Sequence, residues 1–171
     1  MIRYSDGDIF ACGAEALVNP VNCEGVMGAG LAKEFRHRFP EASRSYMAAC
    51  AIGQLQPGRL HEFDRGSGSH PRWVIHFPTK REWRKPSRPE WIGWGLSHLA
   101  PTIERLGINS IGVPALGCGK GGLPWLLVAA EIFRYLNPLA AEVIVFRPPQ
   151  ERSPWERSPS RTETRSTRKR S

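Results

Sequence analysis

The stretch from Asn19 to Leu31 constrains the fold of this chain most, because it joins a predicted strand to a predicted helix through a glycine-rich loop. The apolar run over residues 14–18 predicts a short buried strand, and Leu31 begins the helix. Glycines allow backbone N–H groups to approach a ligand closely, and the first amides of a helix lack intrahelical partners. The stretch therefore predicts a cradle for a phosphate or pyrophosphate; the alternative is a loop that only turns the chain and caps the helix.

The spacing of the glycines decides which kind of cradle this is. It follows the order Gly25-x-x-Gly28-x-Gly30, the reverse of the G-x-G-x-x-G fingerprint of dinucleotide-binding Rossmann folds, so an ordinary Rossmann site is not indicated. Asn22, just ahead of the loop, can donate and accept hydrogen bonds at once, which suits a pair of ribose hydroxyls.

A second strand, glycine-rich loop and helix follow later in the chain. A strand over 110–114 leads into the loop Ala115–Leu123, and a helix over 124–136 follows. The loop is not a Walker A motif, because Lys120 precedes Gly121 rather than Ser or Thr. Two such units place two backbone cradles at one sheet edge, where they can hold a diphosphate flanked by two riboses. ADP-ribose fits that outline.

Strands and helices alternate along the chain. Further strands are predicted over 2–4, 60–63, 73–77 and 142–146, and further helices over 43–52 and 89–106. The alternation predicts an α/β fold with a partly parallel sheet covered by helices on both sides. We expect one domain over 1–146, followed by a disordered basic tail over 147–171 that is rich in Pro, Ser and Arg.

The net charge of +8 is distributed unevenly. Residues 1–146 hold 16 Lys and Arg against 13 acids, whereas residues 147–171 hold 8 against 3. Within the predicted domain, five cations lie in nine residues that contain a single acid: Lys80, Arg81, Arg84, Lys85 and Arg88. With Trp83 among them they predict a contact with a polyanion such as nucleic acid. A solvated charged loop, with Trp83 packed beneath it, is the alternative.

Several other classes of protein are not indicated. No run of about 18 apolar residues exists to span a membrane, and the N-terminus lacks the apolar region of a signal peptide, so we expect a cytoplasmic protein. The cysteines show no spacing typical of zinc, so we expect reduced thiols, no metal and no cofactor. We also expect a monomer.

With these motifs in place, the chain resembles a macro domain over roughly residues 1–146. The marks are Gly7-Asp8-Ile9, the Asn19-x-x-Asn22 strand end with its glycine loop, and the loop from Pro114 to Leu123. Within that family it resembles the DarG branch, antitoxins that remove ADP-ribose from DNA. The narrower marks are Asn22-Cys23-x-Gly25-Val26-Met27-Gly28 and Phe77-Pro78-Thr79-Lys80-Arg81-x-Trp83-Arg84.

The resemblance implies a three-layer α/β/α fold with a mixed, mostly parallel sheet. It also implies hydrolysis of the N-glycosidic bond between ADP-ribose and thymine in single-stranded DNA, which reverses the modification made by a cognate DNA ADP-ribosyltransferase toxin. Lys80 is implied as the catalytic residue and Asn22 as the residue that positions the adjacent ribose.

The resemblance also implies two sets of binding residues, with ADP-ribose as ligand and product rather than cofactor. Asp8 and Ile9 are expected at the adenine, although Asp8 capping a turn is the alternative. The full set expected to contact ADP-ribose is Asp8, Ile9, Asn19, Asn22, Gly25, Val26, Met27, Gly28, Gly30, Leu31, Pro114, Leu116, Gly117, Cys118, Gly119, Lys120 and Gly121. The set expected to contact DNA is Thr79, Arg81, Trp83, Arg84 and Lys85.

The chemistry requires a neutral amine on Lys80, which can attack the anomeric carbon and form a Schiff-base-type adduct that water resolves. We expect burial and the cations Arg81, Arg84 and Lys85 to lower the pKa of Lys80 from about 10.4. One alternative is a protonated Lys80 that holds the DNA or stabilises the leaving base, and another is an exposed lysine at the strand end without such a role. Related eukaryotic glycohydrolases have an acidic residue where Gly121 aligns, which leaves the acid partner of Lys80 open.

Other functions fit the same cradles. A non-catalytic ADP-ribose-binding module has no need of Lys80. A hydrolase of protein-linked ADP-ribose or of O-acetyl-ADP-ribose has no need of the basic segment. A nucleic-acid binder that works through residues 147–171 is a further alternative.

Overall fold

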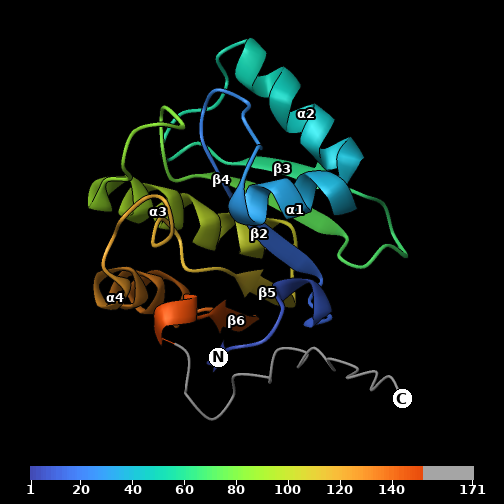
Figure 1. The fold of residues 1–171 in the computed structure, drawn as a ribbon. Coiled ribbons are helices and arrows are strands. Elements are labelled where there is room, and N and C mark those ends of the chain that lie inside the picture. The colour runs from blue at the N-terminus through green and yellow to red at the C-terminus, as the bar shows by residue number, and fades with distance from the viewer. Residues whose placement is uncertain (152–171) are drawn as a thin grey trace, which may run out of the picture.

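The computed structural model describes residues 1–151, which form one mixed sheet between two layers of helices (Figure 1). The strands are β1 Ile2–Ser5, β2 Ala16–Val21, β3 His61–Asp64, β4 Trp73–Pro78, β5 Ser110–Val113 and β6 Glu142–Phe146. The α-helices are α1 Gly30–Arg38, α2 Pro40–Ala51, α3 Pro89–Arg105 and α4 Trp125–Leu136. Short 3₁₀ helices are η1 Ile9–Ala11 and η2 Pro149–Glu151.

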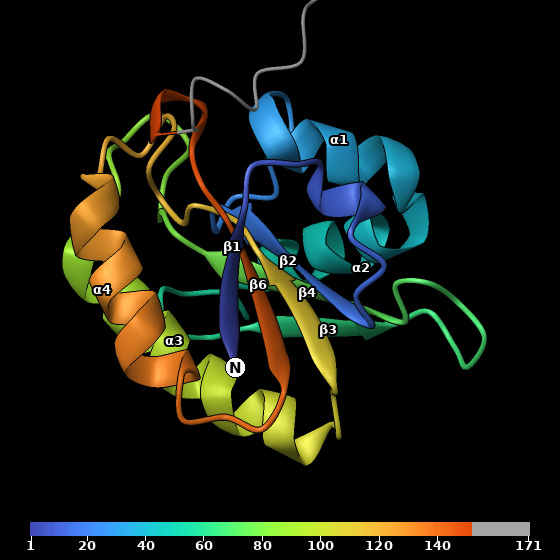
Figure 2. The ribbon, with the colours of Figure 1, turned by 90° about the horizontal axis from the view of Figure 1, so that it is seen from below.

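The six-stranded sheet has the order β1-β6-β5-β2-β4-β3. Only β3 runs antiparallel to its neighbour among the paired strands of the described residues. Figure 2 shows α3 and α4 on one side of the sheet and α1 and α2 on the other. The three-layer α/β/α architecture with a mixed, mostly parallel sheet is thus confirmed.

The central strands are buried on both faces, which explains their continuous apolar sequences. On β2, Ala16 and Val18 belong to the core cluster that includes residues of α3 and α4. Leu17 and Val21 belong to the second cluster, with residues of α1 and α2. The alternation follows from the two-residue period of a strand.

The parallel strands bring their carboxyl ends to one edge of the sheet. β2 pairs with β4 from Ala16 opposite Trp73 to Val21 opposite Pro78, so Asn22 and Thr79 follow at neighbouring positions. The carboxyl edge of an open α/β sheet is where ligands bind. Both glycine-rich loops and the basic segment start from this edge.

Several predicted boundaries differ from the structure: the strand predicted over 14–18 is Ala16–Val21, and most others shift by one residue. Two further differences have a clear physical cause. The second helix begins at Pro40 rather than residue 43, because proline fits the first helical position; the Ser43 hydroxyl lies inside the helix and donates to the Phe39 carbonyl at 3.0 Å. The predicted tail begins too early, because residues 147–151 are part of the described fold. There the Arg147 amide donates to the Ser5 carbonyl at 3.1 Å, and its guanidinium pairs with Asp6.

The predicted disorder of residues 152–171 lies outside the described residues. Within residues 1–151, none of the helices combines the length and apolar character needed to span a membrane.

The close packing of α3 on β4 depends on Gly95. A Cβ built there would lie 2.1 Å from the ring of Phe77, which is fully buried. We expect Gly95→Ala to lower the free energy of unfolding by about 1–3 kcal/mol through overpacking, measured by urea denaturation. Gly93→Ala is the matched control, because its Cβ would meet only a Glu131 oxygen at 3.4 Å. An equal effect of the two substitutions would contradict this account.

Candidate active site

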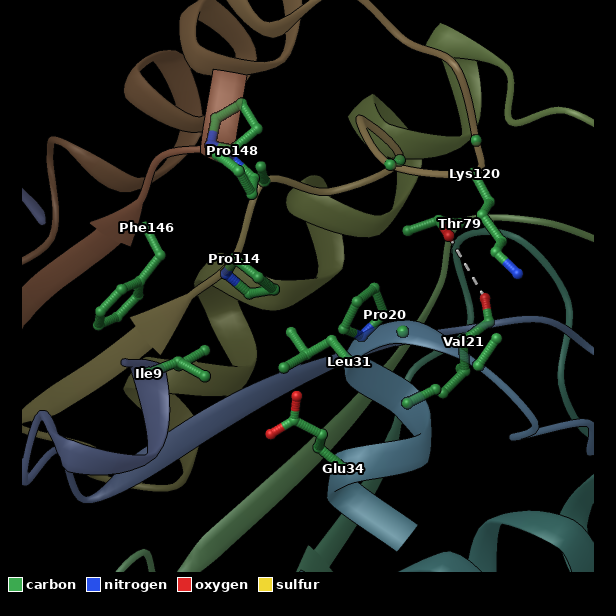
Figure 3. Close-up of a pocket in the computed structure, with 18 of the residues that line it drawn as sticks. Ile9, Pro20, Val21, Leu31, Glu34, Thr79, Pro114, Lys120, Phe146 and Pro148 are labelled. Atoms are coloured by element: carbon green, nitrogen blue, oxygen red, sulfur yellow. Dashed lines mark hydrogen bonds between the residues drawn. The ribbon is translucent and has the colours of Figure 1, made fainter. Parts of the chain in front are cut away.

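A cleft of about 1420 Å³ lies at the carboxyl edge of the sheet. Three loops contribute to it: the first glycine loop (residues 22–29), the lysine loop (79–88) and the second glycine loop (114–123). The rest of the lining comes from the end of β2, from the first turns of α1, and from residues 6–10 and 146–150. Figure 3 shows Thr79 and Lys120 toward one end of the cleft and Ile9 and Phe146 toward the other.

Main-chain hydrogen bonds tie the lysine loop to both glycine loops. The Cys23 amide donates to the Arg81 carbonyl, and the Ser87 amide donates to the Gly121 carbonyl, each at 3.0 Å. The Glu24 carboxylate accepts from the Trp83 amide at 2.8 Å. The lysine loop is thereby fixed at both ends between the two predicted cradles.

Lys80 extends across the cleft toward the second glycine loop. Its Nζ donates to the Lys120 carbonyl at 3.0 Å and to the Trp83 carbonyl at 3.4 Å. Burial, and after it the charge of Lys120, lowers the pKa of Lys80 below its ordinary value. The predicted direction is confirmed, but the neighbouring charge that acts is Lys120, forty positions along the chain, rather than the adjacent cations in the sequence.

Asn22 organises the first glycine loop. Its Nδ2 donates to the Val26 carbonyl at 2.7 Å, while its Oδ1 accepts from the amides of Glu24 and Val26 at 2.9 and 3.2 Å. The hydroxyl of Tyr46, which is 0% exposed, donates to the Asn22 carbonyl at 2.8 Å. The side chain lines the cleft, and most of its hydrogen-bonding capacity shapes the loop around the site.

Asn19 lies away from the cleft, fully buried on the α2 side of the sheet. Since the Ala42 carbonyl can only accept, His76 Nε2 donates to it at 3.1 Å, and His76 Nδ1 accepts from Asn19 Nδ2 at 3.1 Å. Burial lowers the pKa of His76 to about 3, so this histidine is neutral. Asn19 therefore links β2 to β4 and lies outside the cleft lining.

The other end of the cleft is formed by Asp8 and Ile9, as predicted. Asp8 also caps a turn: its Oδ1 accepts from the Phe10 amide at 2.9 Å, and its Oδ2 lies 3.9 Å from Arg38 Nη2. The capping alternative for Asp8 is therefore correct, and it leaves the residue within the cleft lining.

The structure brings most of the predicted ligand residues together. Those that line the cleft are Asp8, Ile9, Asn22, Val26, Gly28, Gly30, Leu31, Pro114, Gly117, Gly119, Lys120, Gly121 and Lys80. Those outside its lining are Asn19, Gly25, Met27, Leu116 and Cys118. Met27 and Leu116 are core residues, because alternate positions of each loop turn inward under it.

Two parts of the lining escaped the sequence analysis. Glu34 of α1 lines the cleft, and Figure 3 shows its carboxylate beside Leu31. Residues 147–150, assigned to the tail by their composition, also line it next to Phe146. Ligands of open α/β sheets bind beyond the carboxyl ends of strands. That rule points to residues 147–150, which follow β6, as it does to Lys80, which follows β4.

The predicted DNA-contacting residues divide between the cleft and its outer rim. Thr79 and Trp83 line the cleft, whereas Arg81, Arg84 and Lys85 lie outside its lining. Trp83 is 46% exposed, so it is not packed beneath the loop.

A side chain at position 121 has no room. A Cβ on Gly121 would lie 2.3 Å from both the Gly117 carbonyl oxygen and Ser87 Oγ. An acidic side chain, such as the one that the resemblance aligns with Gly121, therefore does not fit on this backbone, in part because of Ser87 in the lysine loop.

Comparison with known proteins shows to which family the chain belongs. The sequence profile of the macro domain matches residues 18–132. The chain belongs to the macro domain family. A DNA ADP-ribosyl glycohydrolase of Thermus aquaticus is 42% identical over 168 residues, covering 98% of this chain and 47% of the relative. The Mycobacterium tuberculosis enzyme of the same name is 42% identical over 87% of this chain and 42% of its own.

Solved structures place this macro domain close to DarG. The macrodomain of Thermus aquaticus DarG matches with a TM-score of 0.84 and 44% identity, over 86% of this chain and 99% of that one. Thermosipho africanus DarTG, solved in complex with ADP-ribose, matches with a TM-score of 0.83 and 35% identity, over 90% of this chain and 43% of that one. The chain spans about half the length of the curated relatives it matches.

The bond from Tyr46 to Asn22 makes the first prediction for the site. Tyr46→Phe leaves the Asn22 carbonyl without its buried donor, which we expect to lower the free energy of unfolding by about 1–3 kcal/mol and to weaken ADP-ribose binding in calorimetry. Tyr135→Phe, in half-buried surroundings on α4, is the control and should change stability by about 0.5 kcal/mol or less. An equal loss of unfolding free energy in Tyr46→Phe and Tyr135→Phe would contradict the role assigned to the Tyr46 hydroxyl.

The second prediction for the site concerns the charge of Lys120. Removing it in Lys120→Met should raise the pKa of Lys80, because a cation nearby disfavours the protonated amine. The pKa should stay below its ordinary value, since burial persists. Titration of ¹³C-labelled lysine side chains by NMR measures the change, and Lys120→Arg is the charge-preserving control. An unchanged pKa in Lys120→Met would show that burial acts alone.

Proposed function

We propose that this macro domain is a DNA ADP-ribosyl glycohydrolase that hydrolyses the N-glycosidic bond between ADP-ribose and thymine in single-stranded DNA. The observation that carries the proposal is the position of Lys80. Its amine lies where the three loops meet, inside the cleft, beside an exposed indole and a cationic rim. The names of the relatives that cover nearly all of this chain support the same reaction.

ADP-ribose fits the cleft in one direction. The adenine lies between Ile9 and Phe146, where the lining is apolar and Asp8 can accept from an amino group. The diphosphate lies between the two glycine loops, whose backbone amides suit anions. The second ribose then reaches Asn22 and Lys80 at the opposite end, next to Trp83.

The reaction starts from a neutral Lys80 amine, which its lowered pKa favours. The nitrogen attacks the anomeric carbon, the bond to thymine breaks, and its electron pair goes to the base nitrogen, which takes up a proton. The amine loses a proton in forming the adduct. Water then adds to the adduct carbon, releases ADP-ribose and restores the amine.

The rim of the cleft supports DNA as the carrier of the ADP-ribose. Trp83 is exposed next to Lys80, and stacking of a base on it is worth about 1–3 kcal/mol without sequence preference. Thr79, Arg81, Arg84 and Lys85 surround it on the same loop. A hydrolase of protein-linked ADP-ribose has no use for this arrangement.

The biological partner we propose is a DNA ADP-ribosyltransferase toxin whose modification this domain removes in the cytoplasm, which makes the domain an antitoxin. A Thermosipho africanus relative, 34% identical, is a DNA ADP-ribosyl transferase–DNA ADP-ribosyl glycohydrolase fusion protein, which joins the two activities in one chain.

The test uses a single-stranded oligonucleotide that carries ADP-ribose on one thymine. Wild type should release ADP-ribose, and Lys80→Ala should lose at least about 100-fold in rate, since the covalent step is removed. Lys33→Ala, on the exposed surface of α1 and outside the cleft lining, is the matched control and should react like wild type.

The other functions predict different results. A binding module would bind ADP-ribose in calorimetry and release nothing from the oligonucleotide with either variant. Release from modified protein or from O-acetyl-ADP-ribose, with none from DNA, would replace DNA as the substrate.

A further inference from the structure

The arginines of the lysine loop differ from other arginines of the fold in their partners. The ion pairs found within residues 1–151 involve Arg3, Arg38, Arg65, Arg72, Arg105, Arg134 and Arg147. In that same part of the chain, Arg81, Arg84 and Arg88 form no ion pair, although Glu82 lies between them in the sequence. Arg36, Arg44 and Arg59 form none either, but they contact no aromatic ring within residues 1–151. The charges of Arg81, Arg84 and Arg88 are therefore not neutralised locally.

Aromatic rings hold these arginines instead. The guanidinium carbons of Arg81 and Arg88 lie 6.0 and 5.3 Å from the ring centroid of the same residue, Trp91, and that of Arg84 lies 4.6 Å from Trp83. Arg38, Arg65, Arg72, Arg134 and Arg147 also contact rings, but each of them pairs with a carboxylate as well. A guanidinium held on a ring keeps its N–H donors available.

The platform beneath Arg81 and Arg88 is rigid. Trp91 is only 7% exposed and lies in the first turn of α3, where its amide donates to the Arg88 carbonyl at 3.1 Å. The Arg81 carbonyl is fixed by the Cys23 amide at 3.0 Å. Arg81 and Arg88, both on the loop that carries Lys80, thus contact one buried ring before any ligand arrives, which reduces the conformational entropy that binding costs.

The ligand that suits two prepositioned guanidinium groups is a phosphate, which accepts paired hydrogen bonds from the planar fork. The exposed ring of Trp83 lies on the same loop, and alternation of a stacking ring with cations is typical of single-stranded nucleic acid sites. We infer that Arg81 and Arg88, held on Trp91, bind a backbone phosphate of the DNA strand beside the modified nucleotide. Trp91 is a positioning residue. The inference rests on the proposed function, because it assigns the DNA side of that substrate.

The experiment measures binding of a fluorescent single-stranded oligonucleotide with ADP-ribose on one thymine. Every protein carries Lys80→Ala, so that turnover does not consume the probe. Neutralising both arginines, as Arg81→Gln with Arg88→Gln, should weaken binding and flatten the dependence of log affinity on log salt concentration. The slope should fall by about 0.7 for each phosphate that the protein no longer neutralises. Affinity for free ADP-ribose, measured by calorimetry, should not change.

Matched variants separate position from charge alone. Arg44→Gln with Arg36→Gln removes the same charge on α1 and α2, across the sheet from α3, and should leave the slope unchanged. Trp91→Leu should flatten the salt dependence, whereas Trp91→Phe keeps a ring and should retain much of it. In the variant that already lacks both arginines, Trp91→Leu should add little. Additive effects would show that Trp91 does not act through the arginines.

The outcomes distinguish this inference from the proposed function. An unchanged slope in the double arginine variant, with turnover by wild type, overturns the phosphate site and leaves the glycohydrolase. A reduced slope without turnover by wild type supports the site and overturns the reaction. If Arg36→Gln with Arg44→Gln flattened the salt dependence equally, the effect would come from net charge alone, and the phosphate site would be overturned.

Discussion

The parallel pairing of β2 with β4 is the constraint on which the site depends. It delivers Asn22 and Thr79 to neighbouring positions at the carboxyl edge, and the bond from the Thr79 amide to the Val21 carbonyl continues the pairing to its end. The bond from Cys23 to Arg81 extends the pairing beyond the strands. Lys80, between these bonds, is therefore positioned by backbone that the sheet itself fixes, which is the precision that the catalytic role we propose for it requires.

The electrostatics of the cleft follow from folding rather than from sequence proximity. The cations next to Lys80 in the sequence were expected to lower its pKa, yet Arg81 and Arg84 are directed onto the rings of Trp91 and Trp83. Lys120, from the second glycine loop, supplies the neighbouring charge instead. One loop thus separates two groups of cations. Its lysine lines the cleft, where burial disfavours the charged amine, and its arginines lie outside the cleft lining against aromatic rings.

The sequence predicted the layers, the two glycine loops and the position of Lys80, because strand periodicity and glycine spacing are local signals. The predictions were less accurate where tertiary contacts decide whether a side chain near the cleft faces the core or the cleft, and where the fold ends. Met27 and Leu116 turn into the core, and the Asn19 side chain donates a hydrogen bond to His76 on the neighbouring strand. The composition after Phe146 suggested a tail, but the buried carboxylate of Asp6 holds Arg147 against the cleft.

The close packing around Gly121 explains how the proposed reaction differs from that of enzymes with an acid in this loop. Ser87 and the Gly117 carbonyl occupy the volume that a side chain at 121 requires. Lys80 forms no ion pair within residues 1–151, so no carboxylate there stabilises its protonated form. Burial and the charge of Lys120 lower the pKa of Lys80, which favours the neutral amine and reduces the help that the proposed attack needs from a neighbouring base. The loop whose Ser87 leaves no room for a side chain at 121 therefore also carries the lysine to which we assign the attack.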